Sequence, residues 1–265
     1  MPCPAGCYCL AMLEIVQLPV LQDNYVYLIR DPAMGAVAVV DPAVSDAVEA
    51  ELDRRGWRLT YVLNTHHHGD HVGGNMRLKQ RYGVTIVGPR ADKDRIPGID
   101  VEVGEGETYA FGKEVARVFD VPGHTRGHIA YWFKDSRALF CGDTIFSLGC
   151  GRMFEGTPPQ MWASLAKLRD LPAETRVYCA HEYTESNARF AVTVDPANKA
   201  LADRVAEVKR LRAAGQPTVP SLMGVERQAN PFLRADDPAI AAAVGKPAND
   251  PAQVFGEVRR RKDSF

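Results

Sequence analysis

Four of the seven histidines in this 265-residue chain fall between His66 and His71, and Asp70 lies among them. The run Thr65-His66-His67-His68-Gly69-Asp70-His71 directly follows an apolar, β-branched stretch that ends at Leu63-Asn64. Side chains at the exit of a strand sit on a loop held by a rigid scaffold, where active sites are usually built. Packing is a poor explanation for so many imidazoles in so few residues. The run therefore predicts a metal site on a strand-rich scaffold.

The scaffold itself is predicted by alternating patterns between residue 13 and about residue 182. Short β-branched runs alternate there with longer amphipathic ones, which indicates sheets covered by helices in an α/β fold. Strands are expected at 13–18, 25–29, 36–40, 58–63, 115–119, 129–133, 138–141 and 176–179, and helices near 44–55, 73–82 and 158–170. Periodicity leaves open whether the strands form one sheet or two.

The character of the chain changes after Tyr183. Residues 184–214 are rich in Ala, Arg, Glu, Leu and Val at helical spacing; Pro217 and Pro220 then break the pattern, and an Ala-rich segment follows at 239–244. We expect a catalytic domain over 12–182 and a mainly helical domain over 183–265. Residues 1–11 are expected to be a disordered extension or a product of start-codon choice.

Composition excludes some classes of partner. A formal net charge of −1 creates no global field that would recruit nucleic acid or an anionic membrane. No apolar run is long enough to span a bilayer, and the first residues do not resemble a signal peptide. The six cysteines are expected to be reduced thiols of a cytoplasmic protein. A metal site at Cys3, Cys7 and Cys9 is the less favoured alternative, since no histidine or second cysteine pair lies near them.

Three further ligand-type residues, His124, Asp143 and His181, each follow an apolar run. If four strand exits converge on one rim, they gather seven candidate ligands: His66, His68, Asp70, His71, His124, Asp143 and His181. Imidazoles and carboxylates suit Zn, Fe or Mn. Two divalent ions about 3.5–4 Å apart can share a carboxylate. Asp143 is the candidate for that role because it stands alone at its strand exit.

These motifs resemble the metallo-β-lactamase superfamily: Thr-His-x-His-x-Asp-His, Gly-His-Thr-x-Gly-His, Gly-Asp-Thr and a late histidine. The resemblance implies a four-layer αβ/βα sandwich with a dinuclear site at one edge. It assigns His66, His68 and His124 to one metal; Asp70, His71 and His181 to the other; and Asp143 to both. It also implies two divalent ions, with zinc expected and iron or manganese as alternatives.

Other polar residues near the motifs have less specific explanations. His67 and His128 have no ligand role in the superfamily pattern and are expected to stabilise loops or support a ligand. Asp41 could orient a ligand or cap a turn. Cys141 and Cys179 lie close to ligands, but buried free thiols are the simpler explanation.

Three later segments resemble the glyoxalase II (hydroxyacylglutathione hydrolase) family. They are 149–157, His181-Glu182-Tyr183-Thr184 with Asn187, and 230–234 with 259–263. The resemblance implies hydrolysis of S-D-lactoylglutathione and related 2-hydroxyacyl glutathione thioesters by a metal-bridging hydroxide. It makes the helical domain a substrate-binding domain, with glutathione contacts at Arg152, Tyr183, Asn187, Arg259 and Lys262. Many family members have Lys and Tyr where this chain has Arg152 and Phe154, and Phe154 cannot donate a hydroxyl.

The chemistry of such a substrate agrees with this interpretation. Glutathione carries two carboxylates, and Arg259 and Lys262, three residues apart, would share one face of a helix and could bind one of them. A leaving thiolate has a pKa of about 8.5 and needs little protonation. Asp70 and Asp143 are the candidate catalytic carboxylates. A solvated basic tail is the alternative interpretation of residues 259–262.

Three other functions compete with this hypothesis. A persulfide dioxygenase of the same superfamily would use one iron, and the full second ligand set argues against it. A nuclease would be expected to show more basic character. A zinc-dependent binding module without catalysis is disfavoured by the intact ligand set. We expect a monomeric enzyme that acts on a small molecule, with no nucleic-acid or membrane partner.

Overall fold

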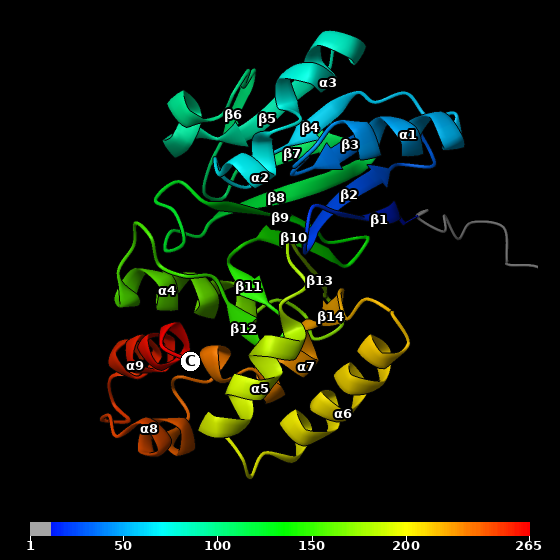
Figure 1. Ribbon diagram of the computed structural model, residues 1–265. Helices are drawn as coiled ribbons and strands as arrows, with labels where there is room; N and C mark the ends of the chain where they lie inside the picture. The colour runs from blue at the N-terminus through cyan, green and yellow to red at the C-terminus, as the bar shows by residue number, and fades with distance from the viewer. Residues whose placement is uncertain (1–11) are drawn as a thin grey trace, which may run out of the picture.

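The computed structural model describes residues 12–265 and contains two six-stranded β-sheets packed together, with helices outside both (Figure 1). The strand order is β1-β2-β3-β4-β5-β6 in the first sheet and β14-β13-β10-β9-β8-β7 in the second. The expected four-layer αβ/βα sandwich with a helical C-terminal part is confirmed. The expectations for residues 1–11, including Cys3, Cys7 and Cys9, fall outside the described residues.

The first sheet is formed by six strands in chain order: β1 (Glu14–Val20), β2 (Asn24–Arg30), β3 (Val37–Val40), β4 (Tyr61–Leu63), β5 (Thr85–Pro89) and β6 (Val101–Val103). The first three are antiparallel neighbours, and β3 to β6 run parallel. Helices α1 (Asp46–Arg55), α2 (Gly69–Val72) and α3 (Asn75–Tyr82) lie on its outer side, and the 3-10 helix η1 (Arg90–Arg95) follows β5 (Figure 1). A separate apolar cluster fills the space beneath α1 and α3, with Val39, Leu52 and Leu78 fully buried.

The second sheet contains β7 (Thr108–Phe111), β8 (Glu114–Asp120), β9 (Ile129–Phe133), β10 (Ala138–Gly142), β13 (Arg176–Cys179) and β14 (Ser221–Leu222). Only β10 and β13 run parallel, and α4 (Pro158–Arg169) lies in the connection between them. A short ribbon, β11 (Ile145–Phe146) and β12 (Gly149–Cys150), precedes that helix. Aromatic rings pack in the core, including Phe140 stacked on Tyr178 at 5.1 Å.

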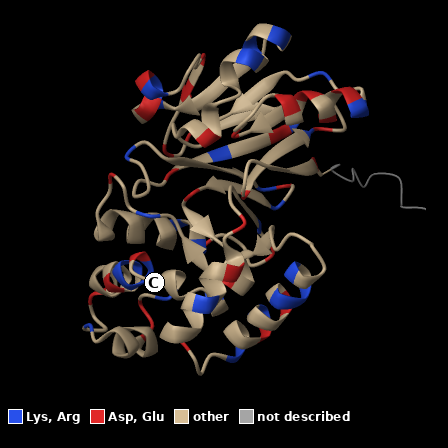
Figure 2. Ribbon diagram, viewed as in Figure 1, with Lys and Arg blue, Asp and Glu red and all other residues tan. Residues whose placement is uncertain are grey.

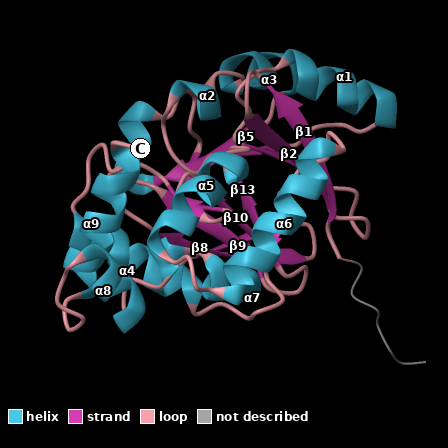
Figure 3. Ribbon diagram, turned by 60° about the horizontal axis from the view of Figure 1, so that its bottom comes forward, coloured by secondary structure: helices cyan, strands magenta, loops and turns pink. Residues whose placement is uncertain are grey.

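The C-terminal helices lie with α4 on the outer side of the second sheet (Figures 1 and 3). They are α5 (Thr184–Val194), α6 (Lys199–Ala213), α7 (Met223–Ala229), the 3-10 helix η2 (Pro231–Leu233), α8 (Pro238–Val244) and α9 (Pro251–Asp263). The helical pattern over 184–214 forms two helices, because Pro196 has no N–H to donate and disfavours helix in the residue before it. Asn198 then begins α6, and its side chain accepts a hydrogen bond from the Leu201 N–H at 3.2 Å.

The strand expected at 58–63 is wrong in its first half, because β4 begins at Tyr61. Its parallel partner β3 begins at Val37, and Tyr61 is already opposite Ala38, so residues 58–59 have no strand to pair with. Strand β5 was missed because Gly88 and Pro89 interrupt its pattern. The edge strands β6 and β14 are too short to show a period.

The charged residues are interspersed over the whole fold, with basic and acidic positions on the same helices (Figure 2). None of the helices in residues 12–265 combines the length and apolar character needed to cross a bilayer.

A buried carboxylate attaches the helical part to the sandwich. Glu226 on α7 is 0% exposed and accepts hydrogen bonds from Ser147 Oγ at 2.9 Å, from the Leu148 N–H at 2.8 Å and from Asn230 Nδ2 at 3.0 Å. Two of these donors belong to the turn between β11 and β12. Removing the acceptor would orphan the buried Ser147 hydroxyl and Leu148 N–H, whereas Asn230 Nδ2 keeps its bonds to the Phe146 and Gly149 carbonyl oxygens.

We predict that Glu226→Ala lowers the free energy of unfolding by about 3 kcal/mol, because orphaned buried donors cost roughly 1–3 kcal/mol each. Urea denaturation followed by circular dichroism measures the change. Asp203→Ala is the matched control, since it removes an exposed carboxylate paired with Lys199 on α6, and should change stability by no more than about 0.5 kcal/mol. Equal midpoints for the two variants would contradict the assignment.

Candidate active site

Strand ends from both sheets meet at one edge of the sandwich, and the seven candidate ligands lie there. His66 and His68 follow β4, and Asp70 and His71 lie on the short helix α2 that comes next. The other sheet contributes the rest: His124 follows β8, Asp143 follows β10 and His181 follows β13. Residues up to 115 positions apart therefore approach one another, since His66 and His181 differ by that number.

One group contains His66, His68 and His124. His68 Nδ1 lies 3.1 Å from His66 Nε2 and 3.0 Å from His124 Nε2. Nitrogen ligands bound to zinc at about 2.0–2.1 Å in tetrahedral geometry lie roughly 3.3 Å apart. The three inner nitrogens therefore have nearly the spacing of a metal site.

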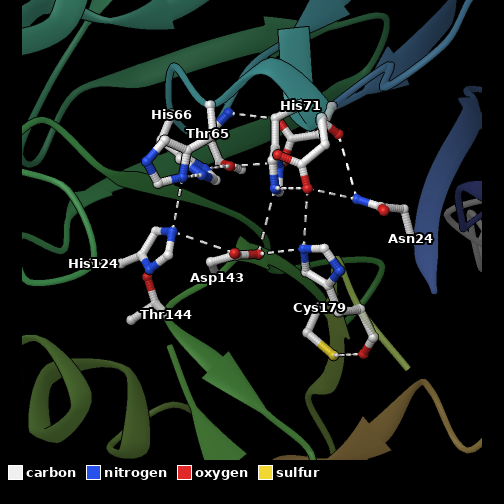
Figure 4. A network of polar contacts seen from close by, with 12 residues as sticks. Asn24, Thr65, His66, His71, His124, Asp143, Thr144 and Cys179 are labelled. Atoms are coloured by element: carbon white, nitrogen blue, oxygen red, sulfur yellow. Dashed lines mark hydrogen bonds and ion pairs between the residues drawn. The ribbon is translucent and has the colours of Figure 1, made fainter. Parts of the chain in front are cut away.

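The second group contains Asp70, His71 and His181. Asp70 Oδ2 lies 3.7 Å from His71 Nε2 and 3.5 Å from His181 Nε2. Asp143 stands between the two groups (Figure 4): its Oδ2 is 3.3 Å from His124 Nε2, and its Oδ1 is 3.5 Å from His71 Nε2 and 3.4 Å from His181 Nε2. One carboxylate thus faces both groups.

Carboxylates hold the outer nitrogens of the second group. His71 Nδ1 is 3.1 Å from Asp41 Oδ2, and His181 Nδ1 is 2.8 Å from Asp23 Oδ1. A proton on each outer nitrogen leaves the inner nitrogen with its lone pair free, which is the form that binds a metal. Sequence reasoning missed Asp23 and its neighbour Asn24, whose Nδ2 donates to Asp70 Oδ2 at 2.9 Å. Their position at the start of the buried strand β2 was the only signal.

Asp41 supports a ligand and also holds the start of the loop that carries His66 and His68. Its Oδ1 accepts from the Thr65 N–H and its Oδ2 from Thr65 Oγ1, both at 2.7 Å, in addition to its contact with His71. The residue has a φ of 49°, in the left-handed region that aspartate tolerates. Asp41 also lies near His66 and His71 in a third cluster of ligand-type atoms. Since its oxygens are already engaged, we do not count it as a ligand.

The remaining histidines lie beside the ligands. His128 Nε2 accepts from the Asp143 N–H at 3.1 Å, and its ring stacks on His66 at 4.5 Å. His67 turns away and contacts Asp92. Cys141 and Cys179 are buried and free, as expected.

Burial and neighbouring charges shift the histidine pKa values of the two groups in opposite directions. Burial lowers the pKa of His66 well below its ordinary value and also lowers that of His124. Burial acts in the same direction on His181, but Asp143, Asp23 and Asp70 outweigh it and raise the pKa of His181 to about 9. Burial would raise the pKa of Asp143, yet His71 and His181 hold it far below its usual range. Because cations bind neutral imidazoles, binding at the second group must displace protons.

Two buried atoms without hydrogen-bond partners indicate that a metal ion fits this site. Among the described residues, His71 Nε2 and Asp143 Oδ1 are buried side-chain atoms without a hydrogen-bond partner. Orphaned buried polar atoms are costly and need an explanation. Both point at the space between the second group and Asp143, where a divalent cation would satisfy them. The donor set, imidazoles with carboxylates, is the one that Zn, Fe and Mn prefer.

A cavity of about 610 Å³ leads from His124 and Asp143 to helices α5 and α9. All five residues that sequence reasoning assigned to substrate binding line it: Arg152, Tyr183, Asn187, Arg259 and Lys262. Sequence reasoning missed Ser186 and Arg189, which α5 adds to the lining. At Gly151 a Cβ would lie 2.0 Å from the Asp143 carbonyl oxygen, so only glycine allows the cavity wall to approach the site so closely.

Aromatic rings form the part of the cavity nearest the histidines. The Tyr183 ring is stacked on His181 with centroids 4.7 Å apart and planes at 4°. Phe154 is 63% exposed and lies 5.2 Å from the His124 ring. Asn187 is buried and donates to the Ser147 carbonyl oxygen at 3.1 Å, so part of its amide is already engaged by the protein.

Positively charged side chains line the other end of the cavity. Arg259 is only 4% exposed, donates to the Cys150 carbonyl oxygen at 2.9 Å and pairs with Asp263 at 3.0 Å. Its Nε has no partner among the described residues. The solvated-tail alternative is therefore wrong for Arg259. Lys262 donates to the Ser186 carbonyl oxygen at 3.2 Å, and burial together with Arg259, Arg189 and Arg152 lowers the pKa of Lys262 to about 8.

The chain is similar in sequence to known proteins over nearly its full length. Residues 21–181 match the family described as "Metallo-beta-lactamase superfamily", and residues 182–265 match "Hydroxyacylglutathione hydrolase C-terminus". The hydroxyacylglutathione hydrolase of Methylococcus capsulatus is 60% identical over 96% of this chain and 99% of its own length. That of Rhodospirillum rubrum is 54% identical over 97% of this chain and 100% of its own length.

Solved structures show the same fold. ETHE1 from Myxococcus xanthus has a TM-score of 0.68 at 24% identity and covers 93% of this chain and 90% of its own. TTHA1623, solved in a di-iron-bound form, has a TM-score of 0.55 at 27% identity and covers 63% of this chain and 91% of its own. Together with the sequence matches, these likenesses establish that the chain belongs to the hydroxyacylglutathione hydrolase family of the metallo-β-lactamase superfamily.

Proposed function

We propose that this enzyme hydrolyses S-D-lactoylglutathione, and related 2-hydroxyacyl glutathione thioesters, to glutathione and the free 2-hydroxy acid. The observation that carries the proposal is the shared cavity, which opens on Asp143 and His124 at one end and on Arg152, Arg259 and Lys262 at the other. A thioester at the first end and a glutathione carboxylate at the second would both find complementary groups. The relatives that bear the hydroxyacylglutathione hydrolase name support the same substrate class.

Two divalent cations belong to the proposal, with zinc as the expected metal and iron or manganese as alternatives. His66, His68 and His124 would hold one; Asp70, His71 and His181 the other; and Asp143 both. The di-iron form of TTHA1623 supports a two-metal site and keeps iron as an alternative. When bound, such ions supply an activated water and polarise a carbonyl.

The chain's own groups would orient the reaction. Asp70 and Asp143 are the carboxylates that face the inner histidine nitrogens, so they are placed to position the attacking water. Tyr183, stacked on His181, forms the wall beside the thioester. The leaving thiolate has a pKa of about 8.5 and needs no dedicated acid. Arg259 lines the cavity and carries a fixed positive charge that a substrate carboxylate would pair with.

The setting of the enzyme is also part of the proposal. We propose a monomer that works in the cytoplasm, without nucleic-acid or membrane partners, with a catalytic domain over 12–182 and a substrate-binding domain over 183–265. The described cysteines, Cys141, Cys150 and Cys179, form no disulfide, which is typical of a reducing compartment. The two family matches meet between residues 181 and 182, close to the proposed boundary.

We predict that the purified protein with two equivalents of zinc cleaves S-D-lactoylglutathione, and that Asp143→Asn lowers kcat at least about 100-fold with loss of bound metal. Thioester absorbance measures the rate, and mass spectrometry of the metals measures occupancy. Asp135→Asn, an exposed aspartate before β10, is the control and should behave as the wild type. Absence of turnover with two metals bound would refute the proposed function.

A second prediction concerns pH. Lys262 is charged below its pKa of about 8 and loses its proton as the pH rises through that value, so affinity for a glutathione carboxylate should fall on the alkaline side. We expect the dissociation constant of S-methylglutathione, a non-cleavable probe without a free thiol, to rise about tenfold between about pH 7 and about pH 9.5. Isothermal titration calorimetry measures it.

Lys262→Arg is the control for this titration, because arginine stays charged over the same range. The variant also cancels any titration of the probe itself, since both proteins bind the same ligand. An identical pH dependence in the two proteins would exclude Lys262 as the carboxylate-binding group.

A further inference from the structure

His67 lies between two proposed metal ligands, and both of its ring nitrogens are held in a clamp formed by Asp92 and Arg95. His67 turns away from His66 and His68; its Nδ1 lies 3.1 Å from Asp92 Oδ2 and its Nε2 lies 3.1 Å from Arg95 Nη1. A guanidinium can only donate, so Nε2 must accept and Nδ1 must carry the proton that goes to Asp92. The geometry therefore requires one neutral tautomer and one orientation of the ring.

Arg95, at the end of η1, joins this clamp to two other loops of the site. Its Nε donates to Asp92 Oδ1 at 3.2 Å, and its Nη2 donates to Glu155 Oε2 at 3.0 Å. The same Glu155 oxygen accepts from the Arg126 N–H at 2.8 Å. One guanidinium thus connects the loop of His66 to His68, the loop that follows His124 and the loop that carries Phe154.

The clamp is packed closely against the loop that follows His124. Asp92 is 2% exposed, and a Cβ on Gly127 would lie 2.2 Å from its Cγ. Only glycine at position 127 allows the backbone to approach the carboxylate so closely. Hydrogen bonds from Arg95 also hold the pKa of Glu155 at about 2, so this partner remains charged at neutral pH. Movement of Arg95 would therefore disturb several contacts at once.

The orientation of the His68 ring depends on its loop more than that of His66 or His124 does. In the first group, the outer nitrogen of His66 faces Thr65 Oγ1 at 3.1 Å, and that of His124 faces the Arg152 carbonyl oxygen at 2.8 Å. Among the described residues, nothing hydrogen-bonds the outer nitrogen of His68, whose Nδ1 faces inward. Its orientation must therefore come from the backbone beside it, which is the backbone that His67 anchors.

The same connection reaches the substrate cavity. Phe154 precedes Glu155, its N–H donates to the His124 carbonyl oxygen at 3.2 Å, and its ring lies 5.7 Å from that of His68. Arg95 therefore contacts both the residue beside His68 and the residue beside Phe154.

We propose that Arg95 is a positioning residue, which holds the His66, His68 and His124 group and the Phe154 wall of the cavity in one geometry. The inference rests on the proposed metal centre. Arg95 touches neither substrate nor ligand, and acts through His67 on one side and Glu155 on the other. Loss of its guanidinium should weaken one metal position selectively and loosen one wall of the cavity.

The test is Arg95→Met, which keeps an unbranched apolar stem and removes the charge and the donors. We expect the first group to bind its cation 10–100-fold more weakly, roughly the loss found when partners behind metal ligands are removed, while the second group keeps its affinity. Titration with cobalt(II), followed by visible absorption, should change from two equivalents to one strong and one weak. kcat should fall and KM rise, and Arg95→Lys should restore part of the cobalt affinity.

Arg90→Met is the matched control. Arg90 lies on the same 3-10 helix and pairs with Glu107 at 2.8 Å, but it does not contact His67 or Glu155. It should keep both cobalt equivalents and the wild-type KM. A surface pair of this kind contributes little beyond local stability.

Two outcomes would contradict the proposals, and a second variant is used if the first does not fold. Wild-type protein that binds no divalent cation would refute the proposed metal centre itself. Wild-type protein with two cations and an Arg95→Met variant with the same two affinities and spectrum, but a lower Tm, would show that Arg95 only stabilises η1 and would overturn the inference. If Arg95→Met does not fold, His67→Leu cuts the same clamp from the other side and must produce the same selective loss.

Discussion

Two backbone hydrogen bonds between the sheets hold together the edge of the sandwich at which the seven candidate ligands meet. The Tyr25 N–H donates to the Ala180 carbonyl oxygen at 2.7 Å, and the Ile129 N–H donates to the Thr65 carbonyl oxygen at 2.9 Å. Each bond joins a strand of one sheet to the loop that follows a strand of the other. His66 and His181 lie immediately beside them. Ligands from opposite layers can meet only because the layers are fastened at that point, and elsewhere the sheets are separated by apolar side chains.

The charge collected at this edge explains the polar surroundings. Several imidazoles and carboxylates are buried side by side, which is costly unless each is paired. Asp41 and Asp23 each take one histidine nitrogen, Thr65 and the Arg152 backbone take others, and the inner atoms face one another around Asp143. Among the described residues, the pairing leaves the buried atoms His71 Nε2 and Asp143 Oδ1 unsatisfied at the centre of the site. A centre of this kind suits a cation and would be a liability without one.

The C-terminal helices supply the walls of the cavity that the sandwich alone does not form. Asn187 lies on α5 and Tyr183 immediately precedes it, and Arg259 and Lys262 lie on α9, so the cavity forms only when both helices are in place. Glu226 secures that arrangement by holding the turn between β11 and β12, which leads directly into Cys150 and Arg152. The cavity is therefore lined by two separate regions of the chain, joined by a few buried polar contacts. This division agrees with the general rule that one fold hosts many activities through differences in what surrounds its site.

The sequence alone determined the candidate ligand types, their order and the nature of the fold, because each group of candidate ligands follows an apolar strand and strand exits lie at sheet edges. Family-specific motifs also pointed to Arg152, Tyr183 and the Arg259–Lys262 pair, which line the cavity in the structure. The sequence could not separate the two sheets, since period-two alternation carries no information about which strands are neighbours. Asp23, Asp41, Arg95 and Glu155 act through partners between 24 and 158 residues away, as the Thr65–Asp41 and His181–Asp23 contacts show. Only the tertiary structure decided those roles, because a carboxylate or guanidinium has no pattern of its own in the chain, and what it does depends on which distant side chain the packing brings to it.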